Sequence, residues 1–302
     1  MKFNFAEKVI VITGGAGGIG SHLAREFSAA GSNLVLLDIN QKKLDSVIST
    51  LTGNGHHAIA LDLTDRAAIS KAIEEIADKY GRIDVLIPNA AITTTDRFDV
   101  RSIESIEHEL DINLRSPLVI IRSCIDLLKK STDPRIITTV SLGGIFPLGE
   151  TPLYTTSKFG LGETPLYTTS KFGLRGAMLS MSLDLASKGI KAGSILPSAT
   201  DTPMLQLEAV EGGNSLQFMD PPQKTEDVVK AFKKMLDNPK FEVYPKPSES
   251  WLVRIAMLVP NQLPRLMPLF VGKGERGHKR YLRELESRGI AREVNGVWEI
   301  IE

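Results

Sequence analysis

Short apolar, β-branched runs alternate with amphipathic stretches along the first 245 residues of the chain. Seven of the runs have the length of buried strands: Val9–Thr13, Asn33–Asp38, His57–Asp62, Val85–Asn89, Arg135–Val140, Lys191–Pro197 and Phe241–Tyr244. Six stretches between them have helical periodicity: Ile19–Ala30, Gln41–Leu51, Arg66–Tyr80, Ser102–Lys130, Tyr167–Ser187 and Thr225–Asp237. This alternation predicts an α/β, doubly wound parallel sheet of seven strands with helices on both faces, and a ligand crevice at the carboxyl ends of the strands.

Charge and cysteine content narrow the function classes. The 36 basic residues balance the 36 acidic residues, so we expect no nucleic-acid partner. Cys124, the one cysteine, excludes an internal disulfide and is expected in the core. A strand begins by Val9 with no charged and apolar leader before it, so the cytoplasm is the expected compartment, and no metal is expected in the site.

A glycine-rich turn follows the first predicted strand and leads into a helix. Its glycines fit both Gly-x-Gly-x-x-Gly, at Gly15, Gly17 and Gly20, and the pattern Gly14-x-x-x-Gly18-x-Gly20. Such a turn lets the backbone approach a pyrophosphate, and the helix start after Ile19 offers free N–H groups. The turn therefore predicts a dinucleotide site of the Rossmann type.

Carboxylates end the next two strands. Asp38 can accept hydrogen bonds from the adenosine ribose and repel a 2′-phosphate, which favours NAD over NADP; capping of the following helix is the alternative. Asp62, with Leu63 after it, can contact the adenine edge, although helix capping is again an alternative.

Taken in order, these and later motifs resemble the short-chain dehydrogenase/reductase family over about residues 6–245. They are the glycine turn, Asn89-Ala90, Asn113, Ser141, a Tyr-x-x-x-Lys box, and Pro197 followed by Thr200 and Thr202-Pro203-Met204. The resemblance implies cofactor contacts from Gly14, Gly18, Ile19, Gly20, Asn89, Ala90, Pro197, Thr200 and Thr202. The chain departs from the family pattern at Ala91 and Ser198, where the family usually has glycine, and both positions are expected in loops beside the nicotinamide.

The Tyr-x-x-x-Lys box has the chemistry that hydride transfer to a carbonyl needs. A tyrosine hydroxyl can protonate the resulting alkoxide if its pKa is lowered, and a lysine four residues on lies on the same helix face. The resemblance implies that this lysine also binds the nicotinamide ribose, that Ser141 bonds the substrate oxygen and that Asn113 anchors a water. Ser141 as a turn former and Asn113 as a packing amide are the alternatives.

The box is present twice, because residues 149–161 recur without change as residues 162–174. Tyr154 and Lys158 have the family's usual spacing from Ser141, whereas Tyr167 and Lys171 have its usual spacing to Pro197. Thirteen residues added to a loop cost only about 0.6 kcal/mol, whereas added to the helix they would place Gly160, Gly162 and Pro165 inside it. We therefore expect Tyr167 and Lys171 to be catalytic and Tyr154 and Lys158 to lie on an enlarged substrate loop. The perfect repeat suggests a recent or engineered duplication.

The expected substrate is a hydrophobic secondary alcohol or ketone, because the candidate lining residues are apolar: Ile145, Phe146, Pro147, Leu148, Met204, Leu205 and Leu207. Packing against the C-terminal extension is their alternative role. Two other functions stay open, namely a non-catalytic NAD-binding regulatory or scaffold protein and a membrane-surface lipid-binding module. Family members usually form dimers or tetramers through the two long helices, here Ser102–Lys130 and Tyr167–Ser187.

A change of composition near residues 245–250 divides a domain of residues 1–245 from an extension of residues 246–302. Residues Trp251–Val271 are apolar on nearly all sides, but Pro260, Pro264 and Pro268 disfavour a membrane-spanning helix. We expect a docked segment that covers the substrate, with peripheral membrane contact as the alternative. The charged tail after Lys273 predicts a solvated helix at His278–Arg288 and a strand at Val297–Ile301.

Overall fold

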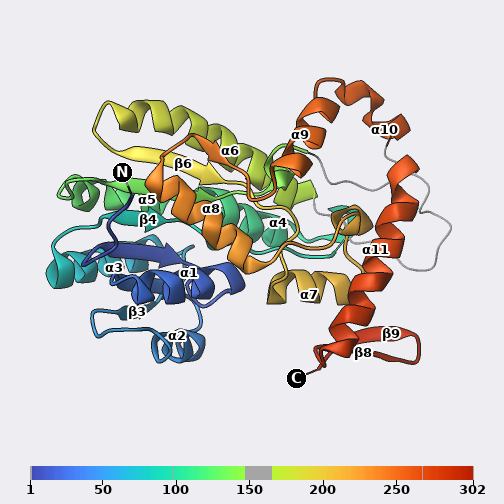
Figure 1. Cartoon of the computed structure of the whole chain (residues 1–302), viewed down its shortest axis with the longest axis horizontal. Helices are drawn as coiled ribbons and strands as arrows, with labels where there is room; N and C mark the ends of the chain where they lie inside the picture. The colour runs from blue at the N-terminus through green and yellow to red at the C-terminus, as the bar shows by residue number, and fades with distance from the viewer. Residues whose placement is uncertain (1, 97, 147–164, 267, 302) are drawn as a thin grey trace.

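A seven-stranded parallel sheet forms the centre of the chain (Figure 1). The computed structural model describes residues 2–96, 98–146, 165–266 and 268–301. The strands are β1 (Val9–Thr13), β2 (Asn33–Asp38), β3 (His57–Ala60), β4 (Val85–Ile87), β5 (Arg135–Thr139), β6 (Lys191–Ile195) and β7 (Glu242–Val243), in the order β3-β2-β1-β4-β5-β6-β7. The chain crosses from one side of β1 to the other between β3 and β4, which confirms the doubly wound fold predicted from the sequence.

Helices cover both faces of the sheet because successive strand residues point to opposite sides. Val9 and Val11 pack with α3 (Arg66–Tyr80), α5 (Ser116–Leu128) and α6 (Pro165–Ala186), whereas Ile10 and Ile12 pack with α1 (Gly18–Ala29), α2 (Gln41–Ile48) and α8 (Thr225–Asp237). Cys124 lies in the first of these cores, and burial raises the pKa of its thiol to about 12. The expected structural role of this cysteine is confirmed.

Several strands end two residues earlier than predicted. The sequence pattern extends β3 to Asp62, β4 to Asn89 and β6 to Pro197, but the last paired residues are Ala60, Ile87 and Ile195. A few backbone hydrogen bonds to neighbouring strands continue past these points, such as that from the Thr139 N–H to the Pro88 carbonyl, but the polar residues that follow lie in loops at the carboxyl edge. This edge is where the functional residues gather.

The predicted long helix 102–130 is interrupted. The structure has α4 (Ile103–Leu110), a π-helical turn η2 (Asp111–Arg115) and then α5. Pro117 has no N–H to donate to the carbonyl of Asn113 four residues earlier, so the regular helical ladder cannot run through this point. The prediction of one continuous helix was wrong for this reason.

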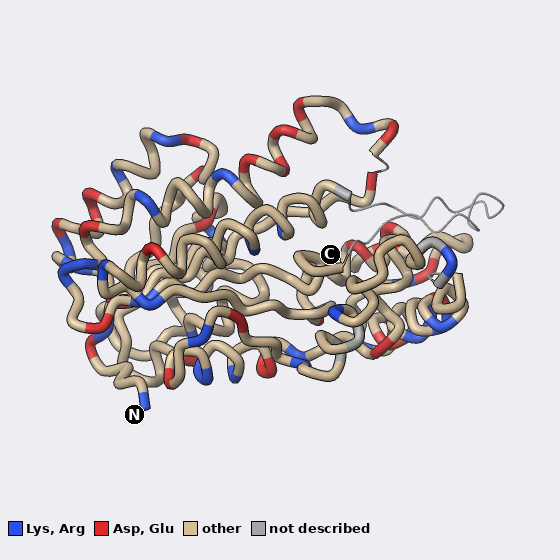
Figure 2. The backbone as a smooth tube through the Cα atoms, turned by 90° about the horizontal axis from the view of Figure 1, so that it is seen from above, with Lys and Arg blue, Asp and Glu red and all other residues tan. Residues whose placement is uncertain are grey.

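The C-terminal elements lie together at one end of the sheet (orange to red in Figure 1). They are α9 (Pro247–Ala256), η6 (Pro260–Gln262), α10 (Leu263–Leu266), α11 (Pro268–Ser287) and the hairpin β8–β9 (Ala291–Val294 and Val297–Ile300). Among the residues that the structure describes, no helix is long and apolar enough to cross a membrane. Acidic and basic residues are interspersed along the whole tube in Figure 2, in keeping with the balanced composition.

The tail helix is longer and more buried than predicted. α11 begins at Pro268 rather than at His278, and Tyr281, Leu282 and Leu285 on it form a third core with α7 (Pro203–Val210) and the short helix η5 (Ser215–Phe218). Gly277 allows a close approach, since an added Cβ would lie 1.8 Å from the Phe218 carbonyl oxygen. The tail helix therefore has a buried apolar face in addition to its exposed charged residues, and the expectation of a solvated helix was wrong.

Candidate active site

The glycine turn between β1 and α1 leaves no room for side chains. Gly14 has a φ of +63°, and a Cβ on Gly20 would lie 2.1 Å from the Gly14 carbonyl oxygen. A Cβ on Gly18 would meet Thr202 at 2.7 Å. Gly17 caps α1 without any side-chain hydrogen bond, so the first N–H groups of a twelve-residue helix are available to a ligand. These features fit the pyrophosphate of a dinucleotide.

Asp38 connects the end of β2 to the glycine turn. Its carboxylate accepts hydrogen bonds from the Ala16 N–H at 3.1 Å and the Asn40 N–H at 3.2 Å. The cap of α2 is Asn40, whose side chain accepts from the Lys43 N–H. Asp38 is therefore not the helix cap, and its position beside the turn suits a ribose contact.

Asp62 is not the N-cap of the following helix, because the side chain of Asp65 caps α3. The Asp62 carboxylate instead accepts hydrogen bonds from the N–H and the hydroxyl of Thr64, which lower its pKa. The Leu63 carbonyl accepts from the Ser116 hydroxyl at 2.7 Å. This loop is thus fixed from two sides, at the edge where an adenine would lie.

Asn89 and Ala90 tie three strand ends together. The N–H groups of both residues donate to the Thr13 hydroxyl, at 2.9 and 3.0 Å, and the Asn89 side chain accepts from the Thr139 hydroxyl at 3.0 Å. A Cβ on Gly14 would lie 2.9 Å from the Ala90 Cα. The ends of β1, β4 and β5 are therefore held in contact despite Ala91 in the following position.

Tyr167 and Lys171 lie one turn apart on α6. The helix runs without a break from Pro165 to Ala186, and proline is favourable at its first position. The Lys171 Nζ lies 5.3 Å from the centre of the Tyr167 ring and donates to the Thr139 carbonyl at 3.4 Å. Tyr154 and Lys158, the alternative pair, lie outside the described residues.

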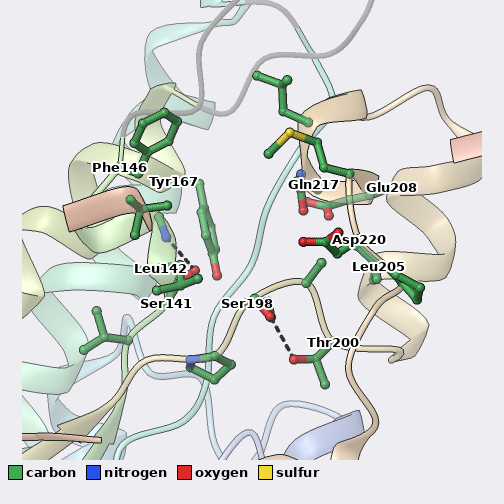
Figure 3. Close-up of a pocket in the computed structure, with 18 of the residues that line it drawn as sticks. Ser141, Leu142, Phe146, Tyr167, Ser198, Thr200, Leu205, Glu208, Gln217 and Asp220 are labelled. Atoms are coloured by element: carbon green, nitrogen blue, oxygen red, sulfur yellow. Dashed lines mark hydrogen bonds between the residues drawn. The ribbon is translucent and has the colours of Figure 1, made fainter. Parts of the chain in front are cut away.

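Ser141 lies beside the Tyr167 side chain (Figure 3). Its hydroxyl accepts from the Gly143 N–H at 3.0 Å, which starts the short helix η3 (Leu142–Gly144), and it is hydrogen-bonded to Tyr167. Ser141 is therefore both a turn former and a neighbour of the tyrosine hydroxyl.

Asn113 lies in the π-helical turn and is fully buried. Its side chain accepts from the Ile92 N–H and donates to the Ile92 carbonyl, both at 2.8 Å. The amide holds the loop after β4, so the packing role foreseen as an alternative is present. No contact of the described residues tests the implied role of Asn113 in anchoring a water.

The pKa of Tyr167 is raised rather than lowered. Burial raises it most, the Glu208 carboxylate adds to this effect, and the hydrogen bond with Ser141 opposes it. Burial also lowers the pKa of Lys171 to about 8, with Glu109 acting in the opposite direction. The expected lowering of the Tyr167 pKa is not found because burial outweighs the hydrogen bond with Ser141, and the nearby carboxylates of Glu208 and Glu109 act in the same direction as burial.

A cavity of about 570 Å³ extends from Ile19, in the first turn of α1, past Ser141 and Tyr167 to the C-terminal elements. Ile19, Pro197, Thr200 and Thr202 line its cofactor end. Phe146, Met204 and Leu205 line it as predicted, whereas Pro147 and Leu148 lie outside the described residues. Two predicted lining residues do not contribute: Ile145 packs into the core, and Leu207 is half exposed on the other side of α7.

Further lining residues come from the segment that was expected to cover the substrate and from two residues, Glu208 and Gln217, that the sequence did not indicate. Val253, Ile255, Val259, Leu263 and Phe270 come from the C-terminal elements, which confirms that residues 251–271 cover a pocket. Glu208 and Gln217 form a polar region among the apolar lining of α7 and η5. The spacing of Glu208 from Leu205 would have placed it on the same face, had α7 been predicted.

The family model of short chain dehydrogenases matches this chain in two overlapping pieces, residues 8–164 and 161–211. The first piece contains Tyr154 and Lys158 and the second contains Tyr167 and Lys171, so the match divides at the repeat. Each copy of the box is therefore aligned with only one of its flanks.

Individual proteins are also similar. Oxidoreductase UcpA of Escherichia coli K12 is 30% identical over 203 residues, which cover 66% of this chain and 72% of that protein. The 2,5-dichloro-2,5-cyclohexadiene-1,4-diol dehydrogenase LinX of Sphingobium indicum is 28% identical over 206 residues, 68% of this chain and 77% of that protein. A 3-ketoacyl-(acyl-carrier-protein) reductase of Brucella melitensis, solved with NADH, has a similar fold, with a TM-score of 0.66 at 22% identity over 81% of this chain and 99% of that chain.

Proposed function

The chain belongs to the short-chain dehydrogenase family and is an NAD(P)-dependent oxidoreductase, and we propose that it transfers a hydride between NAD(H) and a hydrophobic secondary alcohol or ketone. The observation that carries this proposal is the position of the Tyr167 and Ser141 side chains on one wall of an apolar cavity that reaches Ile19 at the start of α1. The turn's fit to a pyrophosphate supports a bound dinucleotide, which would supply the hydride donor or acceptor.

In the proposed mechanism the protein moves one proton. Ser141 orients the substrate oxygen by a hydrogen bond, and the Tyr167 hydroxyl donates its proton to that oxygen as the carbonyl is reduced. Tyr167 carries its proton at neutral pH, as an acid in ketone reduction requires, but its raised pKa opposes transfer of that proton, so the tyrosinate needs a stabilising positive charge. Lys171, held by the Thr139 carbonyl, would bind the nicotinamide ribose hydroxyls and stabilise the tyrosinate that forms.

The carboxylate of Asp38 supports NAD as the cofactor. It lies at the glycine turn and would repel a 2′-phosphate, and the next two residues, Ile39 and Asn40, carry no positive charge to neutralise one. The structure with NADH among the similar folds is compatible with this preference.

The test is turnover of medium-chain 2-alkanones and cycloalkanones with NADH and with NADPH, followed at the absorbance of the reduced cofactor. We expect oxidation of NADH with a kcat/KM at least tenfold above that for NADPH. Tight binding of NADH without turnover of any ketone or alcohol would contradict the proposal and support the non-catalytic alternative.

Family members commonly form oligomers, and we propose a homodimer or homotetramer in which α4, α5 and α6 supply the contacts. Light scattering coupled to size exclusion measures the mass directly, and a monomer would contradict this assignment.

Exposed apolar residues on the C-terminal elements favour peripheral membrane contact as a second role. Trp251, Leu258 and Leu269 are 67, 79 and 74% exposed, and the segment from Trp251 to Gly274 contains Arg254, Arg265 and Lys273 but no acidic residue. Co-sedimentation with phosphatidylserine vesicles, lost on changing these three apolar residues to serine, would support this role. No sedimentation of the unaltered protein would rule it out.

A further inference from the structure

The wall of the cavity opposite Tyr167 contains a buried carboxyl group. Glu208 projects from α7 and Gln217 from η5, and both face Tyr167 and Ser141 across the cavity in Figure 3. The Glu208 side chain is buried, with only 9% of its surface exposed. The lining residues Leu205, Leu216 and Met219 of the same cavity are apolar. Burying a carboxyl group in such surroundings costs free energy. Binding of a polar group of a ligand would explain why this carboxyl group is there.

No cation compensates Glu208 within the described part of the chain. The described lining residues include no lysine, arginine or histidine, and the charged groups acting on Glu208, namely Glu211 and Glu109, are both acidic. Burial raises the pKa of Glu208 to about 7, and the side chains of Thr93 and Gln217 counter this only in part. Tyr167 is the other titratable group whose pKa responds to Glu208.

A second lining carboxylate, Asp220, differs from Glu208. It is exposed and forms an ion pair with Lys273 of α11 at 2.9 Å, so it belongs to the rim. Glu208 is therefore the acidic group that a ligand inside the cavity would meet. A carboxylate accepts hydrogen bonds and attracts ammonium groups, and it disfavours carboxylates and phosphates.

We propose that Glu208 binds the far end of the substrate, which is an elongated apolar ketone or secondary alcohol with a hydroxyl or amino group at the end opposite the reacting carbon. The apolar residues between the two walls, with Val253 and Leu263 from the C-terminal elements, contact its middle. This inference rests on the proposed function and adds the substrate class.

Matched substrates test the proposal. The parent series is the straight-chain 2-alkanones from C8 to C14, and each member is compared with its ω-hydroxy, ω-amino and ω-carboxy derivative in NADH-dependent reduction. At the chain length that spans the cavity, we expect kcat/KM for the hydroxy and amino ketones to exceed that for the parent at least tenfold, and the carboxy ketone to be the poorest substrate.

Three variants assign any preference to Glu208. Glu208→Gln should lower the ratio of kcat/KM for the amino ketone to that for the parent ketone at least tenfold. Glu208→Leu should also remove the preference for the hydroxy ketone. Glu286→Gln is the matched control, because Glu286 is an exposed carboxylate on α11 that does not act on Glu208, and it should leave the preferences unchanged.

The outcomes separate the two proposals. Turnover of the parent ketones with no preference for ω-hydroxy or ω-amino groups, or a preference that survives Glu208→Leu, would overturn the inference while the proposed function stands. No turnover of any ketone would overturn both. Turnover confined to the hydroxy and amino ketones would support the inference strongly. NADH binding and thermal unfolding of each variant show whether it is folded.

Discussion

Replacing Glu208 by glutamine removes a carboxyl group whose pKa burial raises from 4.5 to about 7. The folded protein therefore binds this proton more tightly than the unfolded chain does. The resulting stabilisation is complete below about pH 4.5 and is lost as the pH rises through 7, because the buried group must then ionise. At about 1.36 kcal/mol per pKa unit, the loss is about 3 kcal/mol.

The comparison is made at pH 5 and at pH 8, between which most of this loss, about 2.5 kcal/mol, occurs. For a chain of 302 residues the unfolding entropy is roughly 0.6 kcal/mol per kelvin, so the loss corresponds to about 4 °C in Tm. At each pH we subtract the Tm of the unaltered protein from the Tm of Glu208→Gln. We expect this difference to be about 4 °C larger at pH 8 than at pH 5. Circular dichroism at fixed protein concentration without cofactor provides the measurement.

Glu286→Gln is the control for general charge effects, since it removes the same charge from an exposed position on α11 that does not act on Glu208. It should shift Tm equally at the two pH values. A Glu208→Gln difference that is the same within 1 °C at pH 5 and pH 8 would refute the reasoning, because the carboxyl group would then titrate normally.

Three further substitutions test other parts of the account. Gly20→Ala should weaken NADH binding at least 100-fold in a fluorescence titration, because its Cβ would lie 2.1 Å from the Gly14 carbonyl oxygen; Gly176→Ala, where a Cβ meets nothing within 4 Å, should bind normally. Asp38→Ser should lower the ratio of kcat/KM for NADH over NADPH at least tenfold, and an unchanged ratio would exclude Asp38 from the ribose site. Gly277→Ala should destabilise the packing of α11 by about 1–3 kcal/mol and speed proteolysis of the C-terminal elements, whereas Gly272→Ala, with 3.5 Å of clearance, should not; equal proteolysis of the two variants would contradict this.

The sheet and the glycine turn could be predicted from the sequence because each depends on local patterns. Val9–Thr13, Asn33–Asp38, Arg66–Tyr80 and Thr225–Asp237 have the bounds read from periodicity, flanked by clear turn residues. The strand ends were extended too far because Asp62 and Pro197 continue an apolar run without any strand to pair with. Pairing depends on the neighbouring strand and is not visible locally.

The features that were missed depend on contacts between distant segments. The π-helical turn at 111–115 has a local signal in Pro117. The burial of the Glu208 carboxyl group has no such signal, since the cavity around it is formed by α7, η5 and the C-terminal elements together. The raised pKa of Tyr167 has the same origin, because its burial, which is the largest cause, and the nearby Glu208 and Glu109 involve segments that are distant in sequence. The buried face of α11 likewise depends on η5, more than fifty residues earlier.

The central claim is that the second copy of the repeated box carries the chemistry. Replacing Tyr167 by phenylalanine and, separately, Tyr154 by phenylalanine removes one hydroxyl from each copy, and NADH oxidation with the best 2-alkanone measures the effect. We predict that Tyr167→Phe lowers kcat by about 10²–10⁴-fold with NADH binding intact, and that Tyr154→Phe stays within about threefold of the unaltered enzyme. Full activity of Tyr167→Phe, or a loss of that size in Tyr154→Phe, would contradict the account.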